Sequence, residues 1–260
     1  MHRRRARVLL LTHNEHGDLT TWLRGPLQVY ARPQGPLTGQ SPVLPRKKTM
    51  AVYEMPQTSA RWIKGKLGKK LSPAEAKNVY QRILRTYERF AREAPSIGGR
   101  KNPMSKNFYG ALSAFAYYEC INRDMSPDEI TTMCCEMTIM GRRGGQLSRL
   151  DLNNALVRRI LHALLELRAR RLNRHREDGS WNNSWGMRIN PLHHKEGISV
   201  HLVGCPIADF AKRNGYGELM PYFCEADKAI IEHLGGTLHR EHTVADGYED
   251  CDYWIKNKSE

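Results

Sequence analysis

The chain has 260 residues, 40% of them hydrophobic, which is enough for one substantial domain or two small ones and excludes a collagen-like or wholly disordered protein. Its formal net charge is +14, but nine basic and two acidic residues lie within residues 1–49, so half of the surplus belongs to less than a fifth of the chain. The total charge is therefore weak support for a nucleic-acid partner.

Residues 1–49 show no sustained helical or strand period, and residues 32–48 are rich in Pro, Gly and basic side chains. The sequence predicts a disordered basic leader here, followed by a single domain over residues 50–260. One hypothesis is that Met50, which opens the first stretch typical of folded protein, is the true start. The apolar run after Arg3–Arg5 ends at Thr12, too soon for an export signal or a membrane span, so we expect a cytoplasmic protein with no membrane partner.

The helical part of the domain is predicted over about residues 70–176. Residues 72–75 (Ser-Pro-Ala-Glu) carry a capping box, which predicts a helix that continues to about Ala94. A second helix over about residues 106–121 is apolar around much of its circumference and should be central. Residues 126–129 repeat the capping signature and start a third helix that ends near Gly141.

A fourth helix is predicted over about residues 150–173, with apolar side chains at helical spacing. We expect it to bury Leu152, Leu156, Ile160, Leu164 and Leu167. Its arginines would then lie on the solvated face of the helix. No recognition-helix motif accompanies them, so we predict no nucleic-acid partner.

The pattern changes to an α+β part over about residues 180–257. Strands are predicted at residues 185–189 and 197–203, short helices at 206–213 and 218–234, and an antiparallel hairpin from 238–244 and 251–255. The predicted fold class is therefore α+β, with a helical N-terminal half packed on a small antiparallel sheet with two short helices in the C-terminal half.

Six cysteines are too few for a disulfide framework in a chain of this length, so we expect reduced thiols. Cys205 precedes Pro206, which places the thiol at the N-cap of a predicted helix, where free N–H groups and the helix dipole stabilise a thiolate. The alternative is that Cys205 is a small buried hydrophobic residue.

Two further cysteines have acidic neighbours. Asp227 follows Cys224 by about one helical turn, so the two side chains share a face, with Asp227 either a base or a partner of Lys228. Cys251 and Asp252 are adjacent in a predicted strand, so only one of them faces a given site.

The three cysteines at 205, 224 and 251, together with His201, His239 and His242, are the alternative candidates for a metal site. The chain has no CxxC or HExxH motif, and it lacks the glycine-rich motifs of nucleotide-binding loops. We therefore predict no cofactor, with a metal as the alternative and its ligands unknown.

The C-terminal pieces form an ordered set. They are Cys205-Pro206, Gly215-x-x-Glu218-Leu219, Cys224-x-x-Asp227, Arg240-x-x-Thr243-x-x-x-Gly247 and Cys251-Asp252-Tyr253. Together they resemble the signature of the L-2-amino-thiazoline-4-carboxylic acid hydrolase family over about residues 197–256. The expected Arg after Tyr253 is replaced by Trp254, which puts substrate contacts at the last strand in doubt.

The resemblance implies a hydrolase that opens a cyclic amidine-type C–N bond in a small heterocyclic amino acid, giving a carbamoyl-cysteine type product. It implies catalytic roles for Cys205, Cys224, Asp227, Cys251 and Asp252, and substrate binding by Arg240, Thr243 and Glu218. The partner is then a small carboxylate, and a homo-oligomer is compatible with this reading.

Two mechanisms are open. In one, the Cys205 thiolate attacks the ring carbon, Asp227 or Asp252 transfers protons, and Arg240 clamps the substrate carboxylate. In the other, a carboxylate activates water and the cysteines shape the pocket. The non-enzymatic alternative is a small-molecule or metal-sensing domain, because the same cysteine-rich tail resembles sensor domains related to vinyl reductases.

Overall fold

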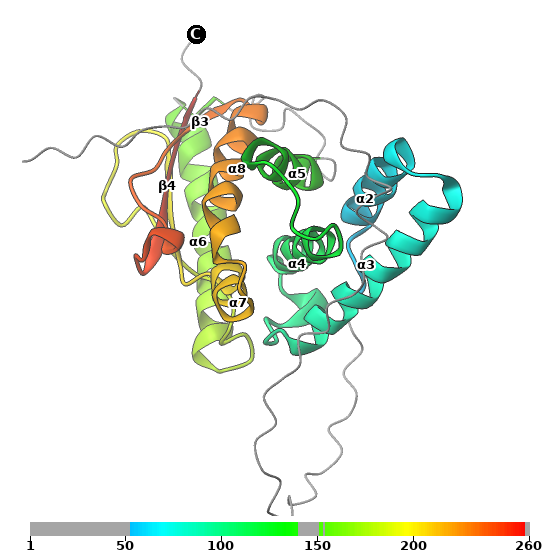
Figure 1. The fold of residues 1–260 in the computed structure, drawn as a ribbon. Helices are drawn as coiled ribbons and strands as arrows, with labels where there is room; N and C mark the ends of the chain where they lie inside the picture. The colour runs from blue at the N-terminus through cyan, green and yellow to red at the C-terminus, as the bar shows by residue number, and fades with distance from the viewer. Residues whose placement is uncertain (1–52, 140–150, 153, 258–260) are drawn as a thin grey trace, which may run out of the picture. The chain divides into compact units, whose positions relative to one another are not determined.

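The computed structural model describes residues 53–139, 151–152 and 154–257 (Figure 1). The predictions for the leader at residues 1–49, a start at Met50, and the end of the third helix at Gly141 lie outside the described residues. The helices are α2 (Gln57–Lys70), α3 (Pro73–Glu93), α4 (Ser105–Cys120), α5 (Pro127–Ile139), α6 (Ala155–Glu177), α7 (Pro206–Asn214) and α8 (Met220–His233). The strands are β1 (Gly186–Ile189), β2 (Ile198–Val203), β3 (Gly236–His239) and β4 (Asp250–Asn257). None of the helices in these ranges is long and apolar enough to cross a membrane.

Both predicted capping boxes are present. The Ser72 hydroxyl accepts a hydrogen bond from the Glu75 backbone N–H, and the Glu75 carboxylate accepts one from the Ser72 N–H, so α3 starts where its sequence predicts. Ser126 and Glu129 make the same reciprocal pair at the start of α5. These bonds are local in sequence, which is why the pattern alone predicts them.

The prediction of a central second helix is confirmed by α4. Its inward side chains are fully buried, and it contacts α2, α3, α5 and α7. Phe115 of α4 stacks on Phe210 of α7 and on Tyr216, and its ring also contacts Phe223 of α8. Burial of these aromatic rings links the helical half to the two helices that lie between β2 and β3 in the chain.

The sequence did not predict α2. The helix starts after Pro56 without a side-chain cap, and Gly65 and Gly68 interrupt its pattern. Its order comes from tertiary packing, since Trp62, Ile63 and other apolar side chains are buried where α2 meets α3, α4 and α5.

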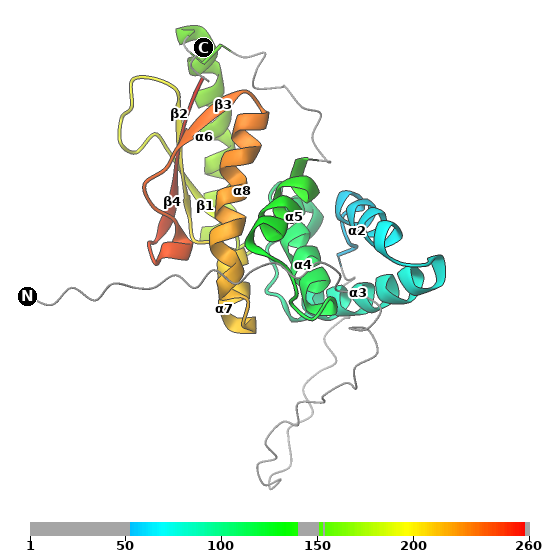
Figure 2. The same cartoon turned by 45° about the horizontal axis from the view of Figure 1, so that its top comes forward.

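The four strands form one antiparallel sheet in the order β1-β2-β4-β3 (Figure 2). The prediction of strands near residues 185–189 and 197–203 is confirmed. The third strand is Gly236–His239 rather than residues 238–244, because residues 244–246 form a short 3-10 helix in the connection to β4. The α+β fold class is confirmed.

The sheet has two chemically different faces, because successive residues of a strand point to opposite sides. On β4, Cys251 and Tyr253 point to one face of the sheet. Their pairing partners on β2, Leu202 and Val200, point to the same face. Asp250 and Asp252 face the other. We call these the cysteine face and the aspartate face.

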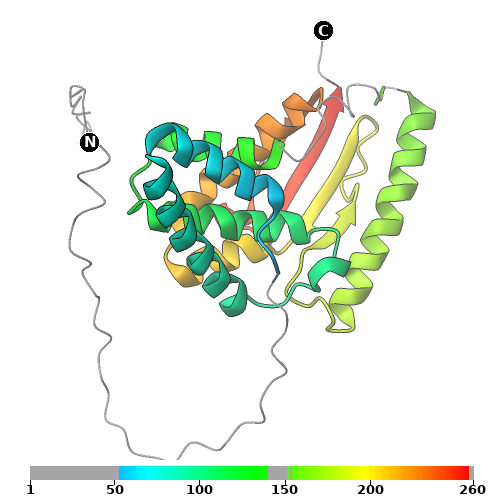
Figure 3. The same ribbon diagram turned by 90° about the vertical axis from the view of Figure 1, so that its right-hand side faces the viewer.

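The long helix α6 lies along the β1 edge of the sheet (Figure 3). The Asn173 side chain donates to the Met187 carbonyl and accepts from the Met187 N–H, each at 2.9 Å. It thereby satisfies backbone groups that an edge strand would otherwise leave unpaired.

The prediction of buried residues on this helix is wrong for four of five positions. Leu152 is buried, but it precedes α6, and the exposed fractions of Leu156, Ile160, Leu164 and Leu167 are 65, 53, 58 and 68%. The side of α6 that packs is centred on Ala169 and Leu172. Helical spacing shows that residues share a face, but it does not show whether another element covers that face.

Candidate active site

Cys205 occupies the predicted N-cap of α7. Its sulfur accepts from the Ala208 N–H at 3.5 Å, and Pro206 is the first helical residue. Burial nevertheless raises the pKa of Cys205 to about 12, despite the backbone hydrogen bonds that favour a thiolate. The expected position is confirmed, but the thiolate expected from it is not favoured near neutral pH.

Asp227 of α8 is held by two groups from outside its helix. Its Oδ2 accepts from the Tyr253 hydroxyl at 2.6 Å and from Arg240 Nη1 at 3.3 Å. Arg240 Nη2 donates to the Cys224 carbonyl oxygen at 2.6 Å, so both terminal nitrogens of Arg240 have protein partners. The Asp227 side chain is 36% exposed and that of Arg240 11%, so the carboxylate is the more accessible member.

Tyr253 is suited to the role of donor in this network. Burial, together with the nearby charge of Asp227, raises the pKa of Tyr253 well above its ordinary value. The hydroxyl therefore keeps its proton. Tyr253 was part of the sequence signature, but its hydrogen bond to Asp227 was not predicted.

The three predicted cysteines converge on the cysteine face. Burial raises the pKa of Cys224 to about 11, and the charge of Asp227 adds to this effect. Cys251 also has a raised pKa because of burial, although its sulfur accepts from the Val244 N–H at 3.2 Å. Each of the three thiols interacts electrostatically with the other two.

Arg240 and Thr243 join this group, and Thr243 contacts Cys224. We call Cys205, Cys224, Asp227, Arg240, Thr243, Cys251 and Tyr253 the cysteine-face cluster. Six of these seven are candidate residues named from the sequence. They come from α7, α8, β4 and the connection between β3 and β4, which are far apart along the chain.

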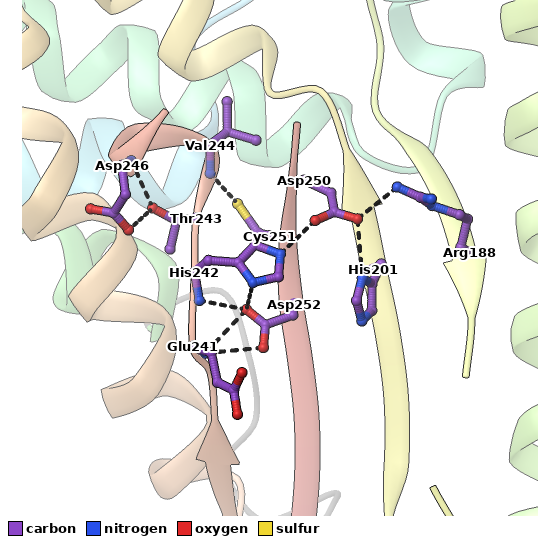
Figure 4. A network of polar contacts seen from close by, with 10 residues as sticks. All are labelled: Arg188, His201, Glu241, His242, Thr243, Val244, Asp246, Asp250, Cys251 and Asp252. Atoms are coloured by element: carbon purple, nitrogen blue, oxygen red, sulfur yellow. Dashed lines mark hydrogen bonds and ion pairs between the residues drawn. The ribbon is translucent and has the colours of Figure 1, made fainter. Parts of the chain in front are cut away.

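Two other candidates lie elsewhere. Asp252 is on the aspartate face, where its carboxylate accepts from the backbone N–H groups of Glu241 and His242 (Figure 4). Glu218 lies beside Arg123 at 3.8 Å rather than with the cysteines. The structure therefore gives Asp252 a role in holding the chain before β4 and does not group Glu218 with the cluster.

Two cysteines that sequence reasoning did not select lie next to the cluster. Helix α5 packs against α8, and the charge of Asp227 reaches Cys134 and Cys135. Burial is the main cause of the raised pKa of both thiols. Nothing in the local sequence of α5 indicates this contact, because it depends on helix packing.

The mixed cysteine and histidine metal site, which the sequence analysis kept as an alternative, does not form among the described residues. The convergent group there is His201, His242 and Asp250, whose potential ligand atoms lie within 4.8 Å of one another on the aspartate face. Asp250 accepts from His242 Nε2 at 2.7 Å, from His201 Nδ1 at 3.0 Å and from Arg188 at 2.7 Å (Figure 4). A guanidinium on the same carboxylate repels a cation, so the group fits a hydrogen-bonded network better than a metal centre.

Trp254, which stands where the resemblance leads one to expect an Arg, also lies on the aspartate face. Its ring stacks on His194 at 4.1 Å, and its Nε1 donates to the Glu196 carbonyl at 2.9 Å. The Trp254 side chain thus anchors the loop between β1 and β2, and it lies on the sheet face opposite Asp227.

One sheet face of this α+β fold thus carries a carboxylate, a guanidinium and several thiols, which are groups that can bind polar ligands and transfer protons. Residues 104–255 match the model of the L-2-amino-thiazoline-4-carboxylic acid hydrolase family, and the chain belongs to this family. The family name indicates a hydrolase. No curated protein and no solved structure matches the chain.

Proposed function

We propose that the protein hydrolyses a cyclic amidine-type C–N bond in a small amino acid resembling L-2-amino-thiazoline-4-carboxylate, giving a carbamoyl-cysteine type product. The observation that carries the proposal is the position of Asp227, an accessible carboxylate fixed by Tyr253 and Arg240 beside three thiols. Membership of the hydrolase family supports the reaction class.

In the proposed reaction, Asp227 takes a proton from water as the water oxygen bonds to the amidine carbon. Asp227 returns this proton to the ring nitrogen, which leaves a tetrahedral carbon bearing a hydroxyl. The hydroxyl becomes a carbonyl as the ring C–N bond breaks, and its proton passes through Asp227 to the nitrogen, which leaves as an amine. Tyr253 and Arg240 hold the Asp227 carboxylate in position during these steps. In this proposal Arg240 is a positioning residue, because one hydrogen bond from each of its terminal nitrogens goes to the protein, to Asp227 and to the Cys224 carbonyl oxygen.

The raised thiol pKa values favour this direct route over a covalent one. Values of about 12 for Cys205 and about 11 for Cys224 leave both as thiols at neutral pH, and a thiol is a poor nucleophile. In the proposal the cysteines and Thr243 surround the reacting atoms without forming a bond to the substrate.

The test is a screen of thiazoline and related cyclic amidine acids for ring opening, followed by chromatography of the products. Asp227→Asn should lower kcat by about 100-fold or more, whereas Cys205→Ser should keep most of the turnover with an unchanged KM. Glu225→Gln, an exposed carboxylate on the same helix, is the matched control.

Three outcomes decide the question. Full activity of Asp227→Asn would remove the proposed base. A Cys205→Ser loss as large as that of Asp227→Asn would favour the covalent route. If the wild-type protein opens none of these rings, the proposed substrate class is wrong.

A further inference from the structure

Helix α6 carries an apolar surface that no element of the described part of the chain covers and that the proposed activity does not use. Leu156, Ile160, Ala163, Leu164 and Leu167 are all exposed and form what we call the α6 stripe. The packed side of the helix, centred on Ala169 and Leu172, faces the opposite direction. Four large apolar side chains grouped on one helix, each more than half exposed, are typical of an interaction surface.

The spacing of the stripe identifies the kind of element that fits it. Leu156, Ile160, Ala163 and Leu167 are separated by four, three and four residues, which is the spacing of the a and d positions of a coiled coil. A straight seam of this type packs against another helix with a similar seam. The chain itself supplies such a helix in a second copy.

The stripe is symmetric about its middle, which suits antiparallel packing of two identical helices. With a twofold axis near His162, Leu156 lies opposite Leu167 of the second copy. Ile160 then lies opposite Ala163 of that copy, next to Leu164. The four residues at the a and d positions thus meet apolar residues, and the same patch serves both copies, as an isologous interface requires.

The charges beside the stripe agree with the same arrangement. Arg159 and Glu166 are seven residues apart, so they lie on the same flank of the helix. In the antiparallel pair, Arg159 of each copy faces Glu166 of the other, which gives two opposite-charge pairs. Within one chain, Glu166 contacts Arg170 at 3.2 Å, a solvent-exposed pair that contributes little.

The arginines beyond the stripe exclude the parallel arrangement. Arg170, Arg171 and Arg174 are exposed in the last turns of α6. Parallel helices would place the two arginine groups side by side, whereas antiparallel helices place them at opposite ends. We propose that the α6 stripe is a homodimer interface in which two copies of α6 pack antiparallel, with Arg159 of each copy paired to Glu166 of the other.

The test measures the dissociation constant of the full chain by analytical ultracentrifugation. Arg159→Glu or Glu166→Arg alone places like charges opposite each other twice, so each should weaken the dimer about tenfold or more. The double charge reversal restores both pairs and should restore the affinity. Glu177→Arg makes the same charge change beyond the stripe and is the matched control.

A second variant tests the apolar contact. Ile160→Asp should weaken the dimer by on the order of a hundredfold. Because Ile160 and the two charged residues are exposed in one chain, the variants should keep the wild-type thermal transition at concentrations where the wild-type protein is monomeric. A full chain that stays monomeric at all concentrations overturns the proposal. A second result also overturns the proposal. In it, the stripe binds vesicles of anionic lipid, Glu166→Arg strengthens that binding, and the double charge reversal does not restore the affinity of the dimer.

Discussion

The carboxylate of Asp250 is the centre of the network on the aspartate face, and its replacement by Asn gives a sharp test of that network. The side chain is 10% exposed and accepts from His201, His242 and Arg188 at 2.7–3.0 Å. Asn keeps the size of the side chain but removes its charge, and it turns one acceptor atom into a donor. At least one of the buried partners is then left without an acceptor.

The expected cost follows from these contacts. A hydrogen bond to a charged group contributes roughly 1.5–3 kcal/mol, and the contact with the half-exposed Arg188 contributes less because solvent screens it. We expect Asp250→Asn to lower the free energy of unfolding by about 3 kcal/mol. For a domain of this size the melting temperature would fall by about 6–12 °C.

The pH dependence gives an independent check. Burial alone would raise the pKa of Asp250, but the hydrogen bonds from His242 and His201 and the nearby positive charges outweigh it and lower the pKa from 3.8. A carboxylate with a lowered folded-state pKa stabilises the fold above its unfolded-state pKa, and this stabilisation is lost as the pH falls through the folded-state value. The difference between the wild-type protein and Asp250→Asn should therefore be full at pH 7 and should shrink below about pH 4.

Urea unfolding followed by tryptophan fluorescence at pH 7 and pH 3 measures both effects. Asp124→Asn, an exposed aspartate, is the control and should change the free energy of unfolding by less than about 0.5 kcal/mol. A loss below about 1 kcal/mol for Asp250→Asn, or a loss that is the same at both pH values, would refute the reasoning.

Three further predictions follow from other contacts. Tyr253→Phe removes the donor to Asp227 and should lower kcat for the proposed reaction about tenfold with KM unchanged; an unchanged kcat would argue against the positioning role. Gly98→Ala places a Cβ against the Trp181 ring at a φ of +99°, and it should lower the free energy of unfolding by about 2–4 kcal/mol, against about 1 kcal/mol for Gly215→Ala, where space is open; thermal unfolding measures both. Similar losses for the two glycines would contradict this. Cys205 and Cys224 should react with iodoacetamide at pH 7 more slowly than free cysteine, as read by mass spectrometry; fast labelling of Cys205 would reverse the preference for direct water attack.

The parts of the fold that were predictable are those with local causes. The capping boxes at Ser72 and Ser126 predict the starts of two helices, because the two residues that form each box are only three positions apart. The alternation of β2 and β4 likewise predicts that Cys251 and Asp252 face opposite sides. It does not say which side holds the cluster, because that depends on where α7 and α8 pack.

The errors have non-local causes. Leu156 and Leu164 have the spacing of a buried face, yet α6 contacts the sheet through another side. The N-cap position of Cys205 was predicted, but the sequence left open whether Cys205 is a thiolate or a buried thiol, because a capping site lowers a thiol pKa only while solvent or charge supports the thiolate. Burial by surrounding segments raises the pKa of Cys205 more than the N-cap hydrogen bonds lower it, and no local sequence pattern predicts this burial.

The two sheet faces cooperate in building the proposed site. Arg240 and Thr243 belong to the connection between β3 and β4, and they reach the cysteine face only if that connection is held against the strand. Asp252 does this from the opposite face by accepting from the N–H groups of Glu241 and His242. Asp252 follows Cys251 in β4 and therefore points to the opposite face, away from the cysteine-face cluster. From that face it anchors the connection that carries Arg240 and Thr243, so its position next to Cys251 supports the proposed site without making it a reacting group.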